Sequence, residues 1–119
     1  MLRLRILLLG DNPLAAQAAC LQLKPHDVIH VMTGPEALEL ACDEDFDGIL
    51  VDVGMPGMSG PDFIAALHAR RPEVAARAVL LTGMTRFDDQ KAAAPLIWKP
   101  LTREDAERLY WWWTGGDDP

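Results

Sequence analysis

The sequence has few of the residues that build disulfide frameworks and metal centres. Its 119 residues include only two cysteines, Cys20 and Cys42, which lie in apolar segments of helical pattern. With no secretory segment before them, they are predicted to be reduced thiols packed as small core residues of a cytosolic protein. The three histidines, His26, His30 and His68, are scattered without the spacing of a metal site and are predicted to be surface or strand residues.

Long hydrophobic runs and an excess of positive charge are also absent. The apolar run Leu2–Leu9 is too short for a signal peptide or a membrane span and leads into a turn, so we expect a soluble, cytoplasmic protein. Lys and Arg number 11 against 18 Asp and Glu, for a net charge of −7. This charge argues against direct contact with nucleic acid or membrane, and an acidic pocket would favour a cation.

Length and composition predict one domain over residues 1–119. Half of the residues are hydrophobic, which is typical of a globular chain, and 119 residues can build one core but not two. We place the folded core at residues 2–113 and interpret residues 114–119 as a tail or the start of a linker.

Short apolar runs alternate with helical patterns along the whole chain. The runs are typical of strands buried on both faces, and a parallel sheet joined by right-handed crossovers follows from the alternation. The sequence therefore predicts an α/β fold with a five-stranded, doubly wound parallel sheet. The predicted strands are Leu4–Leu9, Val28–Val31, Gly48–Val51, Ala78–Thr82 and Leu96–Trp98.

Helix-start signals follow four of the predicted strands. Asn12 with Pro13 is a cap followed by a favoured first helical residue, and the first helix should stop by Pro25. Three capping boxes pair a Ser or Thr with an acid three residues later. They are Thr33 with Glu36, Ser59 with Asp62, and Thr102 with Asp105, and they open helices to about Ala41, Arg70 and Trp113.

The stretch Gly48–Gly60 ends a buried strand at Asp52 and continues as a loop rich in Gly and Pro. Open parallel sheets carry their chemistry at the carboxyl ends of their strands. By itself, Asp52 could equally be a helix cap or a turn residue. Polar residues also end other strands: Asp11, Thr82 and Lys99. Two carboxylates, a hydroxyl and an ammonium at one edge could hold Mg²⁺ and a phosphoryl group.

With these residues in place, the sequence resembles the receiver domain of two-component response regulators over residues 2–113. The resemblance rests on an Asp after the first strand and on three segments: Leu50–Gly60, Leu80–Gly83 and Trp98–Leu101. It implies a flavodoxin-like, CheY-like fold and a phosphoprotein of a two-component system, not a dedicated enzyme. Self-phosphorylation and autodephosphorylation would be its only reactions.

The resemblance also implies a role for each matching residue. Asp52 would accept the phosphoryl group, and Asp11, Asp52 and the backbone carbonyl of Gly54 would bind Mg²⁺. Thr82 would bind a phosphoryl oxygen as the switch hydroxyl. Lys99 would pair with the phosphoryl group, with a cis bond to Pro100. The implied partners are a sensor histidine kinase or phosphotransfer protein and a downstream protein or output domain.

The sequence departs from the family pattern at three places. Gly10 stands where the family usually has a second acid, which predicts weaker Mg²⁺ binding unless that acid is dispensable. Leu96 stands where an aromatic switch residue is usual. The segment between Thr82 and Lys99 is short, so we expect its fourth helix to be shortened or irregular, at most residues 88–93.

The last predicted helix carries four consecutive aromatic residues, Tyr110–Trp113. Neighbouring helical positions lie ~100° apart, so the four cannot all face one core. Leu109 and Trp113 share a face with Ala106, which we predict to be inward. Trp111 and Trp112 would then either cover core near the short fourth helix or form a contact patch for a partner or a second protomer.

Two functions therefore remain open. The first is a phosphoacceptor receiver domain that signals through protein contacts. The second is a pseudo-receiver, with the same fold but no phosphorylation, favoured by Gly10 and Leu96 and opposed by the four retained polar residues. A phosphatase with an aspartate nucleophile is disfavoured because Gly54 stands where such sites usually need a second acid.

Overall fold

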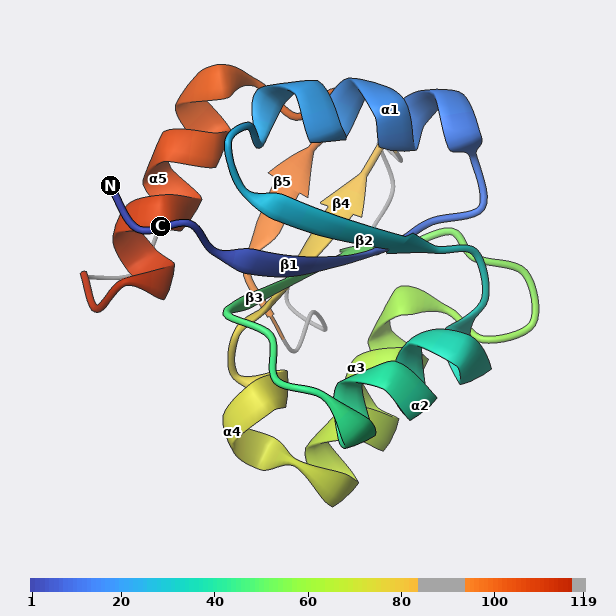
Figure 1. Cartoon of the computed structure of the whole chain (residues 1–119). Coiled ribbons are helices and arrows are strands. Elements are labelled where there is room, and N and C mark those ends of the chain that lie inside the picture. Colours follow the sequence, from blue (N-terminus) through green and yellow to red (C-terminus); the bar gives the residue numbers. More distant parts are fainter. Residues whose placement is uncertain (84–93, 117–119) are drawn as a thin grey trace.

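A central parallel sheet with helices on both faces forms the architecture in the computed structural model, which describes residues 1–83 and 94–116 (Figure 1). The strand order is β2-β1-β3-β4-β5, and all neighbouring strands are parallel. This confirms the predicted fold class. The strands are β1 (Arg5–Leu9), β2 (Asp27–Val31), β3 (Gly48–Asp52), β4 (Ala78–Thr82) and β5 (Leu96–Trp98).

The helices divide between the two faces of the sheet. Helices α1 and α5 cover one face, and α2, α3 and the short α4 lie on the other (Figure 1). Alternate residues of each central strand pack into one of two hydrophobic clusters. In β3, for example, Ile49 and Val51 face α2 and α3, whereas Leu50 faces α1 and α5. The helices are α1 (Pro13–Gln22), α2 (Gly34–Asp43), α3 (Gly60–Arg70), α4 (Pro72–Ala75) and α5 (Arg103–Trp113).

The predicted helix caps are present. The side chains of Asn12, Thr33, Ser59 and Thr102 each accept backbone N–H bonds in the first turn of their helices. In α5 the box is reciprocal, because Asp105 also accepts from the Thr102 N–H at 3.0 Å. These caps satisfy donors that a helix would otherwise leave unpaired, and they fix where each strand-to-helix loop ends.

The helices differ from the sequence prediction in one place. Helix α1 ends at Gln22, within the limit that Pro25 sets. Pro72–Ala75 forms the single turn α4, which the sequence analysis missed because four residues are too few for a visible hydrophobic period. The helix predicted at residues 88–93 lies outside the described residues.

Helix α5 confirms the predicted division of its aromatic residues. Ala106 and Leu109 are buried, Trp112 and Trp113 are partly buried against the same cluster, and Trp111 is 62% exposed. The Trp113 indole lies against the Cα of Gly48 and donates its N–H to the Arg77 carbonyl at 2.9 Å. Trp113 thus covers the start of β3 and the residue before β4.

Within residues 1–83 and 94–116, none of the helices combines the length and the apolar character needed to cross a membrane.

Candidate functional site

Asp52 is the last residue of β3, and its carboxylate is held from two sides. One oxygen, Oδ1, accepts the Gly54 N–H at 3.0 Å, and the other, Oδ2, accepts from Lys99 Nζ at 2.6 Å. The side chain is 15% exposed. These two partners satisfy the carboxylate, and its remaining exposure leaves it accessible to a reactant.

The loop after Asp52 is anchored at both ends. Met55 is buried, and Met58 packs against the Cα of Gly34 at the start of α2. The Gly60 N–H donates to the Val53 carbonyl at 3.3 Å, which brings the start of α3 against the end of β3. These contacts set the position of the Gly54 backbone, whose N–H orients the carboxylate.

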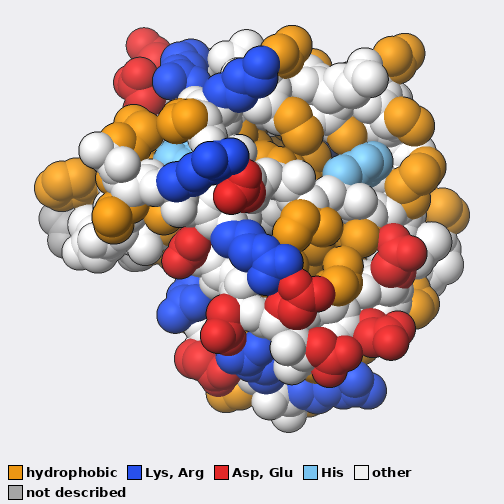
Figure 2. Space-filling model, viewed as in Figure 1, with side chains coloured by type: hydrophobic (Ala, Val, Ile, Leu, Met, Phe, Trp, Pro, Cys, Tyr) orange, Lys and Arg blue, Asp and Glu red, His pale blue; other side chains and the backbone are white. Residues whose placement is uncertain are grey.

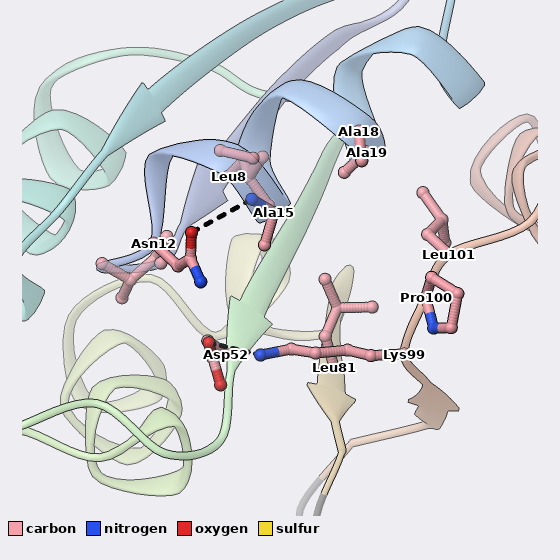
Figure 3. Close-up of a pocket in the computed structure, with 13 residues that line it drawn as sticks. Leu8, Asn12, Ala15, Ala18, Ala19, Asp52, Leu81, Lys99, Pro100 and Leu101 are labelled. Carbon is pink, nitrogen blue, oxygen red and sulfur yellow. Dashed lines mark hydrogen bonds and ion pairs between the residues drawn. The ribbon is translucent and has the colours of Figure 1, made fainter.

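Lys99 follows β5 and reaches across the end of the sheet to Asp52 (Figure 3). Its backbone N–H donates to the Thr82 carbonyl at 2.8 Å, which continues the pairing of β4 with β5. The Lys99–Pro100 peptide bond is cis, as the resemblance implied. The ammonium lies at the mouth of the site, with the side chain 33% exposed.

Thr82 ends β4 and is the one polar or charged residue that is buried in the described part of the chain, at 1% exposure. It lies one residue beyond Leu81, which pairs with Asp52 in the sheet. The sheet therefore places Asp52, Thr82 and Lys99 at the ends of three adjacent strands, as predicted.

Asp11 is exposed at the end of β1, between Gly10 and Asn12. A Cβ on Gly10 would lie 3.8 Å from the Asp52 Cβ, so Gly10 faces the carboxylate directly. Asp11 and Asp52, both among the described residues, are not joined by a hydrogen bond. Within residues 1–83 and 94–116, no three His, Cys, Asp or Glu side chains gather as a metal cluster.

Two features of the site were missed from the sequence. His30 Nε2 donates to the Gly10 carbonyl at 2.7 Å and so connects β2 to the β1–α1 loop. No sequence motif predicts this contact. A cavity of about 130 Å³ also lies beside Asp52, under α1. The run of alanines in α1 was the available signal, because small side chains leave space that larger ones would fill.

Comparison with known proteins identifies the family. The family model of the response regulator receiver domain matches residues 6–105. Because the match covers most of the chain, this protein belongs to the receiver-domain family of response regulators, as the resemblance indicated.

Several characterised proteins are similar to this chain. The cell cycle response regulator CtrA of Brucella ovis is 33% identical over 89 residues, which cover 73% of this chain and 38% of CtrA. The chain thus spans well under half the length of that relative. Among solved structures, the receiver domain of the sensor histidine kinase PA1611 from Pseudomonas aeruginosa PAO1 has a TM-score of 0.84 at 24% identity, covering 97% of this chain and 100% of that one. That structure contains a magnesium ion in its active-site cleft.

A CheY-like receiver domain from Methanospirillum hungatei JF-1 has a TM-score of 0.81 at 22% identity, covering 95% of each chain. At this identity the likeness establishes a shared fold only. The roles of Asp52, Thr82, Lys99 and Asp11 therefore have to be argued from their own geometry.

Proposed function

We propose that this chain, as one receiver domain over residues 1–119, accepts a phosphoryl group on Asp52 from a sensor histidine kinase or phosphotransfer protein. The proposal rests on the position and the hydrogen bonds of the Asp52 carboxylate. This carboxylate stands at the carboxyl end of a central strand, is oriented by the Gly54 N–H and is paired with an ammonium at 2.6 Å. A nucleophile must be both fixed and accessible, and Asp52 meets both requirements.

The residues around Asp52 fit a Mg²⁺ ion. Asp52, Asp11 and the Gly54 carbonyl would offer only oxygen ligands, which Mg²⁺ prefers, and one or two carboxylates suffice because the ion keeps several waters. When bound there, Mg²⁺ would offset the charge that the phosphoryl group brings next to Asp52. Gly10 supplies no third carboxylate, so we expect weaker Mg²⁺ binding than in receivers that have both acids.

The transfer would use the remaining residues for binding and charge balance. The P–N bond to a donor histidine that is protonated on its other ring nitrogen breaks as an Asp52 oxygen forms a new P–O bond. The ring nitrogen takes the electron pair, which leaves a neutral imidazole and an acyl phosphate. Lys99 would move its hydrogen bonds from the Asp52 oxygen to the phosphoryl oxygens. The Thr82 hydroxyl would bind another phosphoryl oxygen as the switch hydroxyl. The protein would be its own substrate, with autodephosphorylation as the only turnover.

Signalling would follow through protein contacts in the cytoplasm. Trp111 is exposed and Trp112 partly buried on α5, and exposed aromatic residues are enriched at protein interfaces. We propose that this face of α5 contacts a downstream protein, an output domain or a second protomer.

Labelling with phosphoramidate, followed by intact mass, tests the proposal. The wild-type chain should gain one phosphoryl group in the presence of Mg²⁺, and Asp52→Asn should gain none. Asp62→Asn is the matched control, because Asp62 lies in the first turn of α3 away from the pocket. Labelling of the Asp52→Asn chain at the wild-type level would refute the assignment.

The pseudo-receiver is the second candidate function, and Gly10 and Leu96 favour it. Tryptophan fluorescence separates the two, because Trp98 is next to Lys99 and half exposed. A working receiver should respond saturably to Mg²⁺ and again to beryllofluoride. No response in either step, together with no added mass, would favour a phosphorylation-independent interaction module.

A further inference from the structure

The cavity beside Asp52 lies between α1 and the segment that joins β5 to α5 (Figure 3). Its volume is about 130 Å³. Most of its lining is apolar and comes from α1, from the β5–α5 segment and from strands β1 and β4: Leu8, Leu9, Ala15, Ala16, Ala18, Ala19, Leu81, Pro100 and Leu101. Apolar cavities of ~150 Å³ take up a molecule the size of benzene, so about six carbon atoms would fill this one.

The composition of α1 creates the cavity. The helix reads PLAAQAACLQ, without a single charged residue, and four alanines line the space. Ala15 and Ala18 are exposed at its edge, so the cavity opens to solvent. Figure 2 shows little charge across α1, whereas charged side chains crowd the lower half of the view, over α2 and α4.

One polar group of the cavity is the Asp52 carboxylate, whose charge Lys99 offsets at 2.6 Å, and the others offer hydrogen-bond donors. The Asn12 Oδ1 accepts the N–H groups of Leu14 and Ala15 at 3.0 and 3.2 Å, so its amide NH₂ turns the other way, towards the pocket (Figure 3). Lys99 Nζ donates to Asp52, and an ammonium has three donors, so it can serve a second acceptor as well. The start of α1 adds the positive end of a helix dipole.

We propose that this cavity binds a small carboxylic acid. An apolar group of up to about six carbons fills the space under α1, and the carboxylate accepts from Lys99 and the Asn12 amide. This ligand site in the unphosphorylated chain does not depend on Asp52 being a phosphoacceptor. Its regulatory consequence rests on the proposed function: a bound carboxylate occupies Lys99, which the phosphoryl group needs, and therefore slows phosphorylation of Asp52.

Calorimetric titration with straight-chain carboxylates from butanoate to octanoate tests the apolar part. Affinity should rise about fourfold for each added methylene until the cavity is full, near heptanoate, and then level off. Ala18→Leu should fill the cavity and reduce hexanoate affinity about tenfold or more. Gln17→Leu, which adds the same side chain at the neighbouring, exposed position, should bind like the wild type. Equal affinities across the series, or undiminished binding to Ala18→Leu, would overturn the proposal.

Comparison of head groups tests the polar part. Hexanoate should bind about tenfold more tightly than 1-hexanol or hexylamine, because the alcohol has no charge to pair with Lys99 and the protonated amine has the same charge as Lys99. Lys99→Met should remove this preference while 1-hexanol still binds. If the preference survives in Lys99→Met, the head group is not at Lys99 and the assignment is wrong.

The same ligand separates this inference from the proposed function. Phosphoramidate labelling of the wild-type chain should slow as hexanoate saturates, with half-inhibition near the calorimetric Kd, and should be insensitive to hexanoate in Ala18→Leu. If hexanoate binds but the wild-type chain is never labelled, the proposed phosphoacceptor function is wrong and the ligand site is still supported. Labelling that is unaffected by saturating hexanoate would show that the bound carboxylate does not compete with the phosphoryl group for Lys99.

Discussion

At the scale of single residues, Gly10 has the most direct bearing on the chemistry of the pocket. It stands where the resemblance to receivers implies a second acid, and its Cα faces Asp52. A Cβ there would make ordinary contact at 3.8 Å, so the position has space for a side chain. The missing carboxylate is therefore a difference in charge and not a consequence of crowding.

Gly10→Asp should bind Mg²⁺ several-fold more tightly than the wild type, because a further carboxylate beside Asp52 offsets the dehydration of the cation. Titration of Mg²⁺ against tryptophan fluorescence measures the effect. Gly10→Asn has nearly the same shape without the charge and should stay close to the wild type. Equal affinities for the Asp and Asn variants would show that charge at this position does not control the metal.

Gly60 is required for a different reason, because the start of α3 approaches the backbone of Asp52 closely. A Cβ at Gly60 would lie 2.7 Å from the backbone oxygen of Asp52, a contact that only movement of the backbone could relieve. Gly60→Ala should lower the free energy of unfolding by about 1–3 kcal/mol and reduce labelling of Asp52. Gly83→Ala, where an added Cβ meets no atom of residues 1–83 and 94–116 within 4 Å, is the control for urea denaturation and should be nearly neutral. Equal losses in both variants would contradict this account.

At the scale of elements, α5 closes one end of the sheet through Trp113. The indole packs on Gly48 so closely that a Cβ there would lie 2.3 Å from the ring. The capping box at Thr102 fixes the start of the same helix, and the Trp113 N–H fixes its end on Arg77. Helix α5 is thus positioned at both ends, while Trp111 between them remains exposed.

Gly48→Ala should destabilise the fold by about 1–3 kcal/mol because the added methyl group meets the indole. In the background of Trp113→Ala, the same Gly48→Ala change should have a much smaller effect, since the ring is gone. A double-mutant cycle by urea denaturation measures this coupling. Additive effects of the two changes would show that the ring does not occupy this position.

At the scale of the whole molecule, His26 connects the first strand, the second strand and the last helix. Its Nδ1 accepts the Leu4 N–H at 3.0 Å, and its ring stacks on Tyr110 with centroids 5.5 Å apart. Burial, and then the charge of Arg103, lower the pKa of His26, against the smaller opposing effects of Asp27 and Asp47. The folded protein therefore favours the neutral ring.

A lowered pKa makes stability depend on pH in a defined direction. The unfolded chain binds a proton at His26 more readily than the folded chain does, so the stability from His26 is complete above the ordinary value of about 6.5 and is lost as the pH falls below it. Urea denaturation should give a lower free energy of unfolding at pH 5.5 than at pH 7.5. His26→Gln, which keeps an acceptor but does not titrate, should flatten that slope.

The carboxylates with lowered pKa values lose their contribution in a separate, more acidic range. Burial raises the pKa of Asp105, but hydrogen bonds from Thr102 and Arg108 outweigh it and hold that pKa below its usual value. Its stabilising effect is therefore retained until the pH falls below about 4.

A wild-type slope between pH 7.5 and 5.5 that persists unchanged in His26→Gln would refute the assignment to His26.

The sequence by itself determined the elements and the strand-end residues, because these depend on local signals. Apolar runs, caps such as Asn12 and the Gly- and Pro-rich loop after Asp52 act over a few residues, and the alternation of strands and helices then restricts the topology. The family motifs placed Asp52 and Lys99 in one site, but the ion pair between them at 2.6 Å is a finding of the structure. The single turn α4 was not predicted, because four residues are too few to show a helical hydrophobic period.

Only the tertiary structure decided what depends on residues far apart in the chain meeting in space. The contact of His30 with the Gly10 carbonyl, the ring of Trp113 on Gly48 and the place of His26 under Tyr110 have no local pattern. The cavity under α1 is of the same kind, because its volume depends on how Ala18 and Leu101 are separated by the packing of α1 and the β5–α5 segment on one sheet. Local sequence fixes which groups are available, and packing fixes the spaces between them.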